Sequence, residues 1–376
     1  MSERFSLKDL LFNKESVTYL AALFYAKDVS FPKKKFIKNI MGLLPELELK
    51  QRISCIRKEL EKTLQGNYKE SIKTILAVLP PELDPAKTDD DFGKFILAPL
   101  AEFVAANGCN KKDLYTSLNA LREMTKRFSA EDAIRYFINA FPEETLYFLK
   151  EGATSYNYHI RRLSSEGTRP KLPWGIGITT HYKEALPILD ILFSDPTRYI
   201  TRSVANHMND ISKIDPDLVV EKLALWKESG KQNIQEMNFI CRHSLRTLVK
   251  KGYPEALELL GYPCHPKITI ENFKLSTKKV PIGSYLEFSF EIYSLSDQNL
   301  MIDYIVHYRS KSGSTSPKVF KIKKTHVKKG ERVVITKKQA FKPMTTKKLY
   351  PGEHYMELQI NGKKLPLSSF VLVEPS

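Results

Sequence analysis

The segment RRLSSEGTRPKLPW, residues 161–174, holds the side chains best suited to chemistry in this sequence. A helix is expected to end at Glu166, and a loop stiffened by two prolines then presents Arg169, Lys171 and Trp174. A carboxylate can stabilise developing positive charge, and a tryptophan can offer its π-face to a base or to a cation. Burial of the tryptophan in the core is an equally good interpretation, so the segment alone leaves both readings open.

A second carboxylate, Asp210, lies in a segment that repeats part of the first. Isoleucine recurs every 40 residues and is followed two positions later by arginine. The isoleucines are Ile160, Ile200 and Ile240, and the arginines are Arg162, Arg202 and Arg242. A period near 40 is typical of HEAT-like repeats, in which paired helices stack into a solenoid.

Helices that stack in register would place their polar faces on one surface. The predicted faces are Tyr158, Arg162 and Glu166; Arg198, Arg202, Asn206 and Asp210; and Asn238, Arg242, Arg246 and Lys250. This surface is cationic and contains the carboxylates of Glu166 and Asp210. A solvated outer face with ordinary exposed ion pairs explains the same pattern.

The spacing of apolar residues changes near residue 260. Before it the spacing is helical, and Ser129 with Asp132 predicts the start of one helix. After it, short β-branched segments between turn signals predict strands at 267–275, 285–295, 300–310, 318–326, 331–340, 354–360 and 369–374. The predicted fold is multidomain: an all-α HEAT-like-repeat solenoid over residues 1–264, followed by a small all-β immunoglobulin-like sandwich over residues 265–376.

Most of the net charge of +16 lies in the predicted sandwich. Residues 265–376 contain 20 Lys and Arg against 9 Asp and Glu, a net charge of +11, whereas the first 264 residues carry +5. This excess favours a polyanionic partner, either nucleic acid or an anionic membrane surface. Lys323 and Lys324 are candidate contacts, although lysines also protect sheet edges.

Several function classes lack their signatures. The sequence has no GxxxxGKS/T, GxSxG or HExxH motif and no GxGxxG after a predicted strand, which argues against the corresponding nucleotide-driven motors, serine hydrolases, zinc proteases and dinucleotide-binding enzymes. The neighbours Cys264 and His265 have no second half-site, so no metal or cofactor is expected. No secretory signal and no apolar stretch of about 20 residues is found. We therefore expect a cytoplasmic protein without a membrane partner.

The motifs SSEGTRPKLPW and RSVANHMNDISK resemble the AlkC branch of the bacterial alkylpurine DNA glycosylases, HEAT-like-repeat proteins related to AlkD. The segments ELELKQRI and TKRFSAEDAIRYFI fit the same pattern, so the resemblance runs through most of residues 5–260. The basic sandwich resembles the immunoglobulin-like domain that one AlkC subgroup carries.

This resemblance implies a monofunctional DNA repair glycosylase that removes cationic alkylated bases, chiefly 3-methyladenine and 3-methylcytosine, from duplex DNA. It assigns catalytic roles to Asp210, Glu166, Glu131 and Trp174. A base that is already cationic is a good leaving group, so carboxylates need only stabilise an oxocarbenium-like transition state and position water. The candidate DNA contacts are Arg162, Arg169, Lys171, Arg202, Arg242, Arg246, Lys323 and Lys324.

Two other function classes stay open from the sequence. The chain can be a non-catalytic helical-repeat protein that binds nucleic acid, or a scaffold whose concave face holds a partner protein. Neither class requires carboxylates in a cationic groove, because acidic groups weaken binding to a polyanion. For the glycosylase we expect a monomer in the bacterial cytoplasm that associates with the nucleoid when it is bound to double-stranded DNA.

Overall fold

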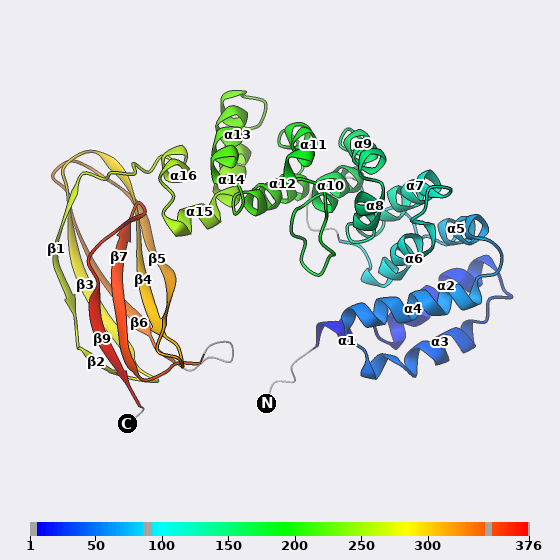
Figure 1. Cartoon of the computed structure of the whole chain (residues 1–376), viewed down its shortest axis with the longest axis horizontal. Coiled ribbons are helices and arrows are strands. Elements are labelled where there is room, and N and C mark those ends of the chain that lie inside the picture. The colour runs from blue at the N-terminus through cyan, green and yellow to red at the C-terminus, as the bar shows by residue number, and fades with distance from the viewer. Residues whose placement is uncertain (1–5, 86, 88–91, 343–347, 375–376) are drawn as a thin grey trace. The chain divides into compact units, whose positions relative to one another are not determined.

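The computed structural model describes residues 6–85, 87, 92–342 and 348–374 (Figure 1). The chain divides into two compact units. The first consists of Met1–Ile214 and Leu225–Ser244, and the second of Asp215–Ala224 and Leu245–Ser376. None of the helices in the described ranges combines the length and the hydropathy needed to cross a bilayer.

Up to residue 259 the regular elements of the described residues are helices. They are α1 (Leu7–Leu11), α2 (Lys14–Lys27), α3 (Lys33–Met41), α4 (Leu49–Thr63), α5 (Tyr68–Ala77), α6 (Ala98–Gly108), α7 (Leu114–Thr125), α8 (Ile134–Ala140), α9 (Pro142–Gly152), α10 (Tyr158–Gly167), α11 (Leu186–Leu192), α12 (Arg198–Ile211), α13 (Pro216–Glu228), α14 (Ile234–Ser244), α15 (Arg246–Lys251) and α16 (Pro254–Leu259). Short 3-10 helices lie at η1 (Leu44–Glu46), η2 (Phe95–Leu97) and η3 (Tyr182–Ala185).

The 40-residue period corresponds to α10, α12 and α14, of which each packs against the next. The isoleucine of each repeat is buried in the core of the first unit. An aromatic ring precedes each isoleucine, and arginines from the preceding helix cover two of these rings: Arg162 lies 4.5 Å from the ring centre of Tyr199, and Arg198 lies 3.8 Å from that of Phe239. The predicted helical repeat is therefore confirmed.

The polar stripe predicted along α12 turns inward at its end. Arg198, Arg202 and Asn206 are half-buried, whereas Asp210 is only 6% exposed. Four residues turn an α-helix by about 400°, so a series with this spacing drifts by about 40° per step. After three steps the drift is about 120°, which carries Asp210 away from the face of Arg198.

The stripe predicted for the third repeat is wrong. α14 ends at Ser244, and Arg246 lies on the separate helix α15, which belongs to the second unit. The helix start predicted at Ser129 is also wrong. α8 begins at Ile134 without a side-chain cap, and the Ser129 hydroxyl donates a hydrogen bond of 2.7 Å to the carboxylate of Glu131 instead. Glu131 therefore lies in a turn before α8.

The second unit contains a two-sheet sandwich. Its strands are β1 (Ile268–Leu275), β2 (Lys279–Pro281), β3 (Tyr285–Ser294), β4 (Gln298–Arg309), β5 (Thr315–Val327), β6 (Arg332–Ala340), β7 (Gly352–Ile360), β8 (Lys363–Lys364) and β9 (Ser368–Val373). One sheet has the order β1-β3-β6 and the other β2-β9-β7-β4-β5, with β8 paired to β7. Alternate residues of β3 and β4, such as Phe288, Phe290, Ile302 and Tyr304, fill the core between the sheets.

All seven predicted strands are present, and the short strands β2 and β8 add to them. The helices α15 and α16, which the predicted boundary at residue 264 assigns to the solenoid, share a compact unit with the strands. Their connecting turn lies directly against the turn between β7 and β8. A Cβ atom on Gly252 would lie 2.7 Å from the carbonyl oxygen of Gly362, so both positions require glycine.

Candidate functional site

Six side chains form a continuous series of ion pairs that we call the acid–base chain: Glu131, Arg162, Glu166, Arg169, Asp210 and Lys213. The ion pairs are Arg162 Nη1 to Glu131 Oε2 at 2.6 Å, Arg162 Nη2 to Glu166 Oε2 at 3.8 Å, Arg169 Nη1 to Glu166 Oε1 at 2.5 Å, Arg169 Nη2 to Asp210 Oδ2 at 2.8 Å, and Lys213 Nζ to Asp210 Oδ1 at 2.9 Å. The members come from the turn before α8, from α10 and the loop after it, and from the end of α12 and the residues that follow. The structure thus joins the three predicted carboxylates through two arginines.

Arg169 is the central member of the acid–base chain. Its Nε and Nη2 both donate to Asp210 Oδ2, at 2.9 and 2.8 Å, while Nη1 donates to Glu166. The residue is only 8% exposed. Burial alone would lower the pKa of Arg169, but Glu166 and Asp210 raise it above its ordinary value. Its guanidinium is therefore a permanent positive charge that separates two carboxylates.

Glu166 lies at the C-terminal end of α10 and is 5% exposed. Burial would raise the pKa of Glu166, but Arg162, Arg169 and the Ser203 hydroxyl together hold it below its ordinary value. The hydroxyl donates a hydrogen bond of 2.6 Å to Glu166 Oε2. Glu166 is accordingly ionised near neutral pH, as a group that stabilises positive charge must be.

Arg162 connects the acid–base chain to the ring of Tyr199 as well as to the turn before α8. It donates to the Ser129 hydroxyl at 3.1 Å in addition to Glu131, and its guanidinium lies over the ring. Burial would lower the pKa of Arg162, yet the carboxylates of Glu131 and Glu166 raise it. The position of the Glu131 carboxylate is therefore defined by two donors.

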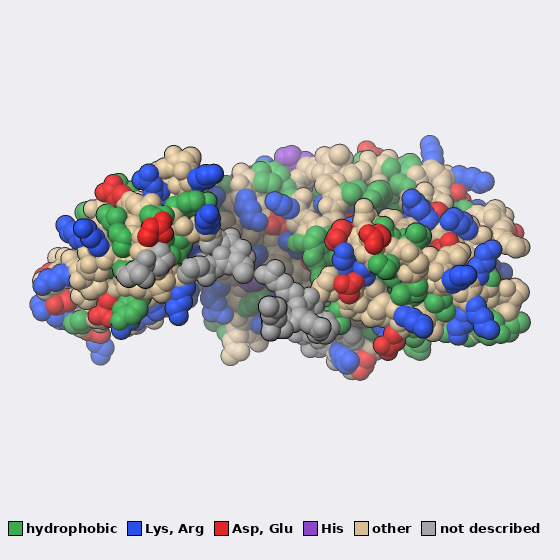
Figure 2. Space-filling model, turned by 90° about the horizontal axis from the view of Figure 1, so that it is seen from below, with side chains coloured by type: hydrophobic (Ala, Val, Ile, Leu, Met, Phe, Trp, Pro, Cys, Tyr) green, Lys and Arg blue, Asp and Glu red, His purple; other side chains and the backbone are tan. Residues whose placement is uncertain are grey.

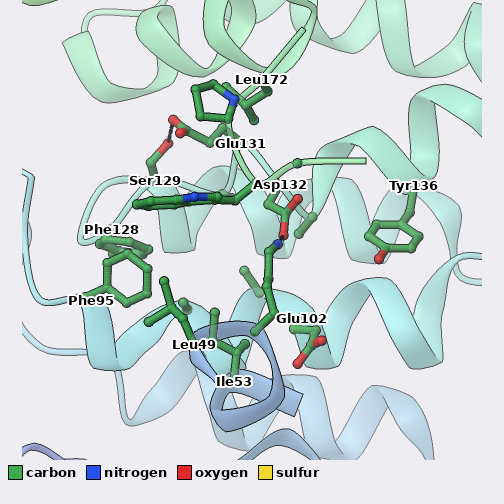
Figure 3. A pocket seen from close by; sticks show the side chains of 18 residues that line it. Leu49, Ile53, Phe95, Glu102, Phe128, Ser129, Glu131, Asp132, Tyr136 and Leu172 are labelled. Carbon is green, nitrogen blue, oxygen red and sulfur yellow. Dashed lines mark hydrogen bonds and ion pairs between the residues drawn. The ribbon is translucent and has the colours of Figure 1, made fainter. Parts of the chain in front are cut away.

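An aromatic cavity of about 150 Å³ lies beside Glu131 (Figure 3). Phe95 and Phe128 form one side of it, and Glu131 with Ser129 lies at another. The remaining lining residues are Leu49, Lys50, Ile53, Ala98, Ala101, Glu102, Ala130, Asp132, Ala133, Tyr136, Leu172, Pro173, Trp174 and Gly175. Glu131 and Trp174 are thus the two predicted catalytic residues that line this cavity, whereas Glu166 and Asp210 lie outside its lining.

Trp174 is 65% exposed, so its interpretation as a core residue is wrong. Its backbone φ of 62° lies in the left-handed region, which a residue with a bulky side chain rarely adopts. Such strain persists only where the surroundings impose it, and it is concentrated at functional sites. Trp226, by contrast, is buried and stacks on Phe193 with ring centres 4.7 Å apart.

The candidate DNA contacts differ in how accessible they are. Lys171 and Arg242 are exposed, Arg162 and Arg202 are half-buried, and Arg169 is buried; Arg246 is half-buried in α15, and Lys323 and Lys324 are exposed on β5. Figure 2 shows Lys and Arg side chains over the displayed face of each unit, with Asp and Glu side chains among them.

Further residues of the site were not predicted from the sequence. Ser203 and Lys213 bond the carboxylates of Glu166 and Asp210, respectively. His207 is fully buried with its Nδ1 3.1 Å from the carbonyl oxygen of Ser165. Burial, helped by the charge of Arg169, lowers the pKa of His207 to about 4, so the ring is neutral. The spacing of 203, 207 and 210 follows one helix face and was a usable signal.

No group of three or more His, Cys, Asp and Glu side chains within the described ranges is arranged to hold a metal ion. The chemistry that the arrangement itself offers is electrostatic. Three carboxylates are each held by an arginine, Glu166 among them is ionised, and Glu131 lines a largely apolar cavity together with the exposed Trp174. Such a site can stabilise a cationic transition state and orient a water molecule.

Comparison with known proteins places the chain in a family. A domain model described as "Uncharacterised protein YhaZ, C-terminal Ig-like domain" matches residues 269–374. The chain is 34% identical over 357 residues to "Uncharacterized protein YhaZ" of Bacillus subtilis (strain 168), covering 94% of this chain and 96% of that protein.

A solved structure is similar over nearly the whole chain. It is "Pseudomonas fluorescens alkylpurine DNA glycosylase AlkC bound to DNA containing an abasic site analog", which matches with a TM-score of 0.85 and 30% identity over 98% of this chain and 100% of that one. The two-sheet sandwich is therefore immunoglobulin-like, as predicted. The chain belongs to the AlkC-type alkylpurine DNA glycosylases of the HEAT-like-repeat AlkC/AlkD superfamily, in the subgroup that carries a C-terminal immunoglobulin-like domain.

Proposed function

We propose that the protein is a monofunctional DNA glycosylase that hydrolyses the N-glycosidic bond of cationic alkylated bases, 3-methyladenine and 3-methylcytosine, in duplex DNA. The similarity to AlkC, which was solved bound to DNA, supports DNA glycosylase activity in general. The observation that carries the proposal for this chain is the buried Arg169, which bonds Glu166 and Asp210 at once. Carboxylates fixed in this way are suited to stabilising a cationic transition state.

The reaction needs little proton transfer to the leaving group. When the glycosidic C–N bond breaks, its electron pair goes to the base, which becomes neutral because it was cationic. The sugar becomes an oxocarbenium-like species, water adds to C1′, and the proton that this water loses passes to the solvent. In this scheme Asp210 positions the water, Glu166 and Glu131 stabilise the sugar cation, and Trp174 contacts the base or the sugar.

The burial of Arg169 favours a different role for it than the phosphate contact predicted from the sequence. A guanidinium that is 8% exposed and bonded to two carboxylates fixes their positions and keeps them apart. Within the first unit we assign phosphate contacts to the exposed Lys171 and Arg242 and to the half-buried Arg202. Such contacts position the duplex without reading its sequence, as repair of a lesion at any position requires.

The deciding experiment is incubation of the protein with methylated duplex DNA, followed by chromatography of the released bases. The wild type is expected to release 3-methyladenine and 3-methylcytosine. Asp210→Asn should abolish release and leave DNA affinity unchanged or higher, because the neutral side chain no longer repels phosphates. Asp217→Asn is the matched control, since Asp217 is exposed on α13. DNA binding by the wild type without release of either base would instead indicate the non-catalytic binding protein.

A further inference from the structure

A loop without helix or strand, residues 168–181, connects α10 to η3 and carries both Arg169 and Trp174. We call it the site loop. A backbone hydrogen bond of 3.2 Å joins the Gly175 N–H to the Leu172 carbonyl within it. Loops of this length are commonly mobile, yet this one must place a guanidinium between two carboxylates and hold Trp174 at a left-handed φ. Residues outside the loop must therefore hold it in place.

Arg135, on the first turn of α8, bonds the beginning and the middle of the site loop. Its Nη1 donates to the carbonyl oxygens of Gly167 at 3.0 Å and Arg169 at 2.8 Å, and its Nε donates to that of Ile176 at 2.5 Å. The side chain is 0% exposed and is the largest fully buried side chain in the described part of the protein. A single guanidinium therefore ties together the beginning and the end of the segment that bears Trp174.

Asn139, one helical turn after Arg135, continues the same row of contacts. Its Nδ2 donates to the Gly177 carbonyl at 2.9 Å, and its Oδ1 accepts from the Thr179 N–H at 2.9 Å. Residues four apart lie on one helix face, so one side of α8 presents hydrogen-bonding groups along the returning half of the site loop. Asn139 is half-buried, which makes it a milder place to test than Arg135.

The hydrogen bonds that Arg135 makes to the site loop offset part of the free-energy cost of burying its guanidinium. Taking a guanidinium out of water is unfavourable without compensating bonds, and its bonds here go to backbone carbonyls. The planar fork of arginine can reach several carbonyls at once, which a lysine ammonium cannot do with the same geometry. Gly167 also ends α10, where the helix dipole favours a positive charge. These features explain why an arginine occupies this buried position.

We propose that Arg135, assisted by Asn139, is a positioning residue for base excision: it ties residue 169 to residue 176 of the site loop and thereby sets the positions of Trp174 and Arg169. This inference rests on the proposed glycosylase function. Because residues 169 and 176 are bonded to the same guanidinium, the segment between them has fewer accessible conformations than a free loop. It also supplies the constraint that the left-handed backbone of Trp174 requires.

The test compares Arg135→Gln, Arg135→Lys and Asn139→Ala with a matched control, Arg52→Gln. Arg52 is also buried, and it also donates to backbone carbonyls, those of Leu47, Lys8 and Phe12, but far from the site loop in sequence and outside the cavity lining. Three quantities are measured: thermal stability, affinity for duplex DNA containing an abasic-site analogue, and the single-turnover rate of 3-methyladenine release from methylated duplex DNA.

A fourth measurement reports on the loop without any reaction. The chain has two tryptophans, so Trp226→Phe in every variant leaves Trp174 as the sole source of tryptophan fluorescence. In Arg135→Gln we expect the fast component of its anisotropy decay to grow. The release rate should fall on the order of 100-fold, since misplacement of a reacting group by about 1 Å costs this much. The affinity for DNA should stay within about threefold of the wild-type value. Arg135→Lys should lie between Arg135→Gln and the wild type.

Asn139→Ala should show the same two changes, but its release rate should fall only on the order of 10-fold. Arg52→Gln should change neither the release rate nor the anisotropy decay. Wild-type release and anisotropy in Arg135→Gln would overturn the proposal, as would equal losses in Arg135→Gln and Arg52→Gln. If Arg135→Gln does not fold, Asn139→Ala decides by the same criteria.

Different results would contradict the glycosylase function and the positioning role of Arg135. If the wild type releases no base while Trp174 gains motion in Arg135→Gln, the proposed function is wrong and the control of the loop stands. If the wild type releases base while Arg135→Gln and Asn139→Ala leave both rate and anisotropy unchanged, the function stands and the positioning role is wrong.

Discussion

The shared guanidinium of Arg169 defines the distance between Glu166 and Asp210, because both carboxylates bond to it directly. In Arg169→Lys one ammonium replaces three N–H groups that point in fixed directions, so it cannot satisfy both carboxylates with the same geometry. We expect the single-turnover release of 3-methyladenine to fall by about 10- to 100-fold.

The neighbouring Lys171 provides the control for that change, because it is exposed on the same loop. Lys171→Gln should lower DNA affinity and leave the release rate on saturating DNA near that of the wild type. A release rate for Arg169→Lys equal to that of the wild type would show that the bridging geometry is not required.

The buried His207 makes the free energy of unfolding of the protein depend on pH. Its folded-state pKa of about 4 lies below its ordinary value of 6.5. Between these two values the unfolded chain binds a proton that the folded chain does not, so stability is lost as the pH falls. From pH 6.5 to pH 4 the free energy of unfolding of the wild type should therefore fall by roughly 3 kcal/mol more than that of His207→Asn.

Urea denaturation at several pH values measures this difference. The carboxylates of the protein titrate in both proteins and cancel in the comparison. Parallel pH profiles for the wild type and His207→Asn would contradict the burial of a neutral imidazole.

The carboxylates could be named from sequence motifs, whereas their supporting residues could not. Glu166 and Asp210 stand in motifs that resemble the AlkC family. Arg135 acts through carbonyl groups some 30 to 40 positions away in the sequence, and no local sequence pattern predicts such contacts. Trp174 was undecided in the sequence because its exposure depends on the path of the site loop.

At the scale of elements, alternation and turn signals were sufficient for the long strands. β2 has three residues and β8 has two, which is too short for alternation to be recognised. The break between α14 and α15 was missed because neither glycine nor proline stands at Ser244 or Leu245. The late start of α8 was missed because Ser129 bonds Glu131 rather than a backbone N–H.

The contact between α8 and the end of α10 yields a prediction at this scale. A Cβ on Gly167 would lie 2.6 Å from Cγ2 of Ile134. Gly167→Ala would gain about 0.5–1 kcal/mol of helix propensity but would lose about 1–3 kcal/mol through overpacking. We therefore expect net destabilisation, seen as a Tm lower by a few degrees in calorimetry.

Gly177→Ala is the matched control, because a Cβ there would meet no atom within 4 Å. It should leave the Tm unchanged or slightly raised, through lower entropy of the unfolded chain. Equal Tm values for the two variants would contradict the close approach of the two helices.

At the scale of the whole molecule, charge is divided unequally, with +11 in residues 265–376 and +5 before them. If the sandwich holds DNA through Lys323 and Lys324, replacing both by glutamine should reduce the slope of log affinity against log salt by about 1.8, since each phosphate contact contributes about 0.9. Fluorescence titrations of labelled duplex at several salt concentrations measure this slope.

Lys278 and Lys279 supply the control pair. They lie at and just before β2, at the opposite edge of the larger sheet from β5, which bears Lys323 and Lys324. Replacing them by glutamine should leave the slope unchanged. If the two double variants lower it equally, the charge of the sandwich acts diffusely rather than through β5.

The burial of the acid–base chain has a consequence for how the protein responds to ionic strength. The side chains of Glu166, Arg169 and Asp210 are 7%, 10% and 6% exposed, so dissolved ions have little access to the bonds between them. Exposed lysines on DNA are screened within about 10 Å at 0.1 M salt. Added salt should therefore shorten the time that the protein spends on DNA while leaving the hydrolysis rate of each bound complex the same.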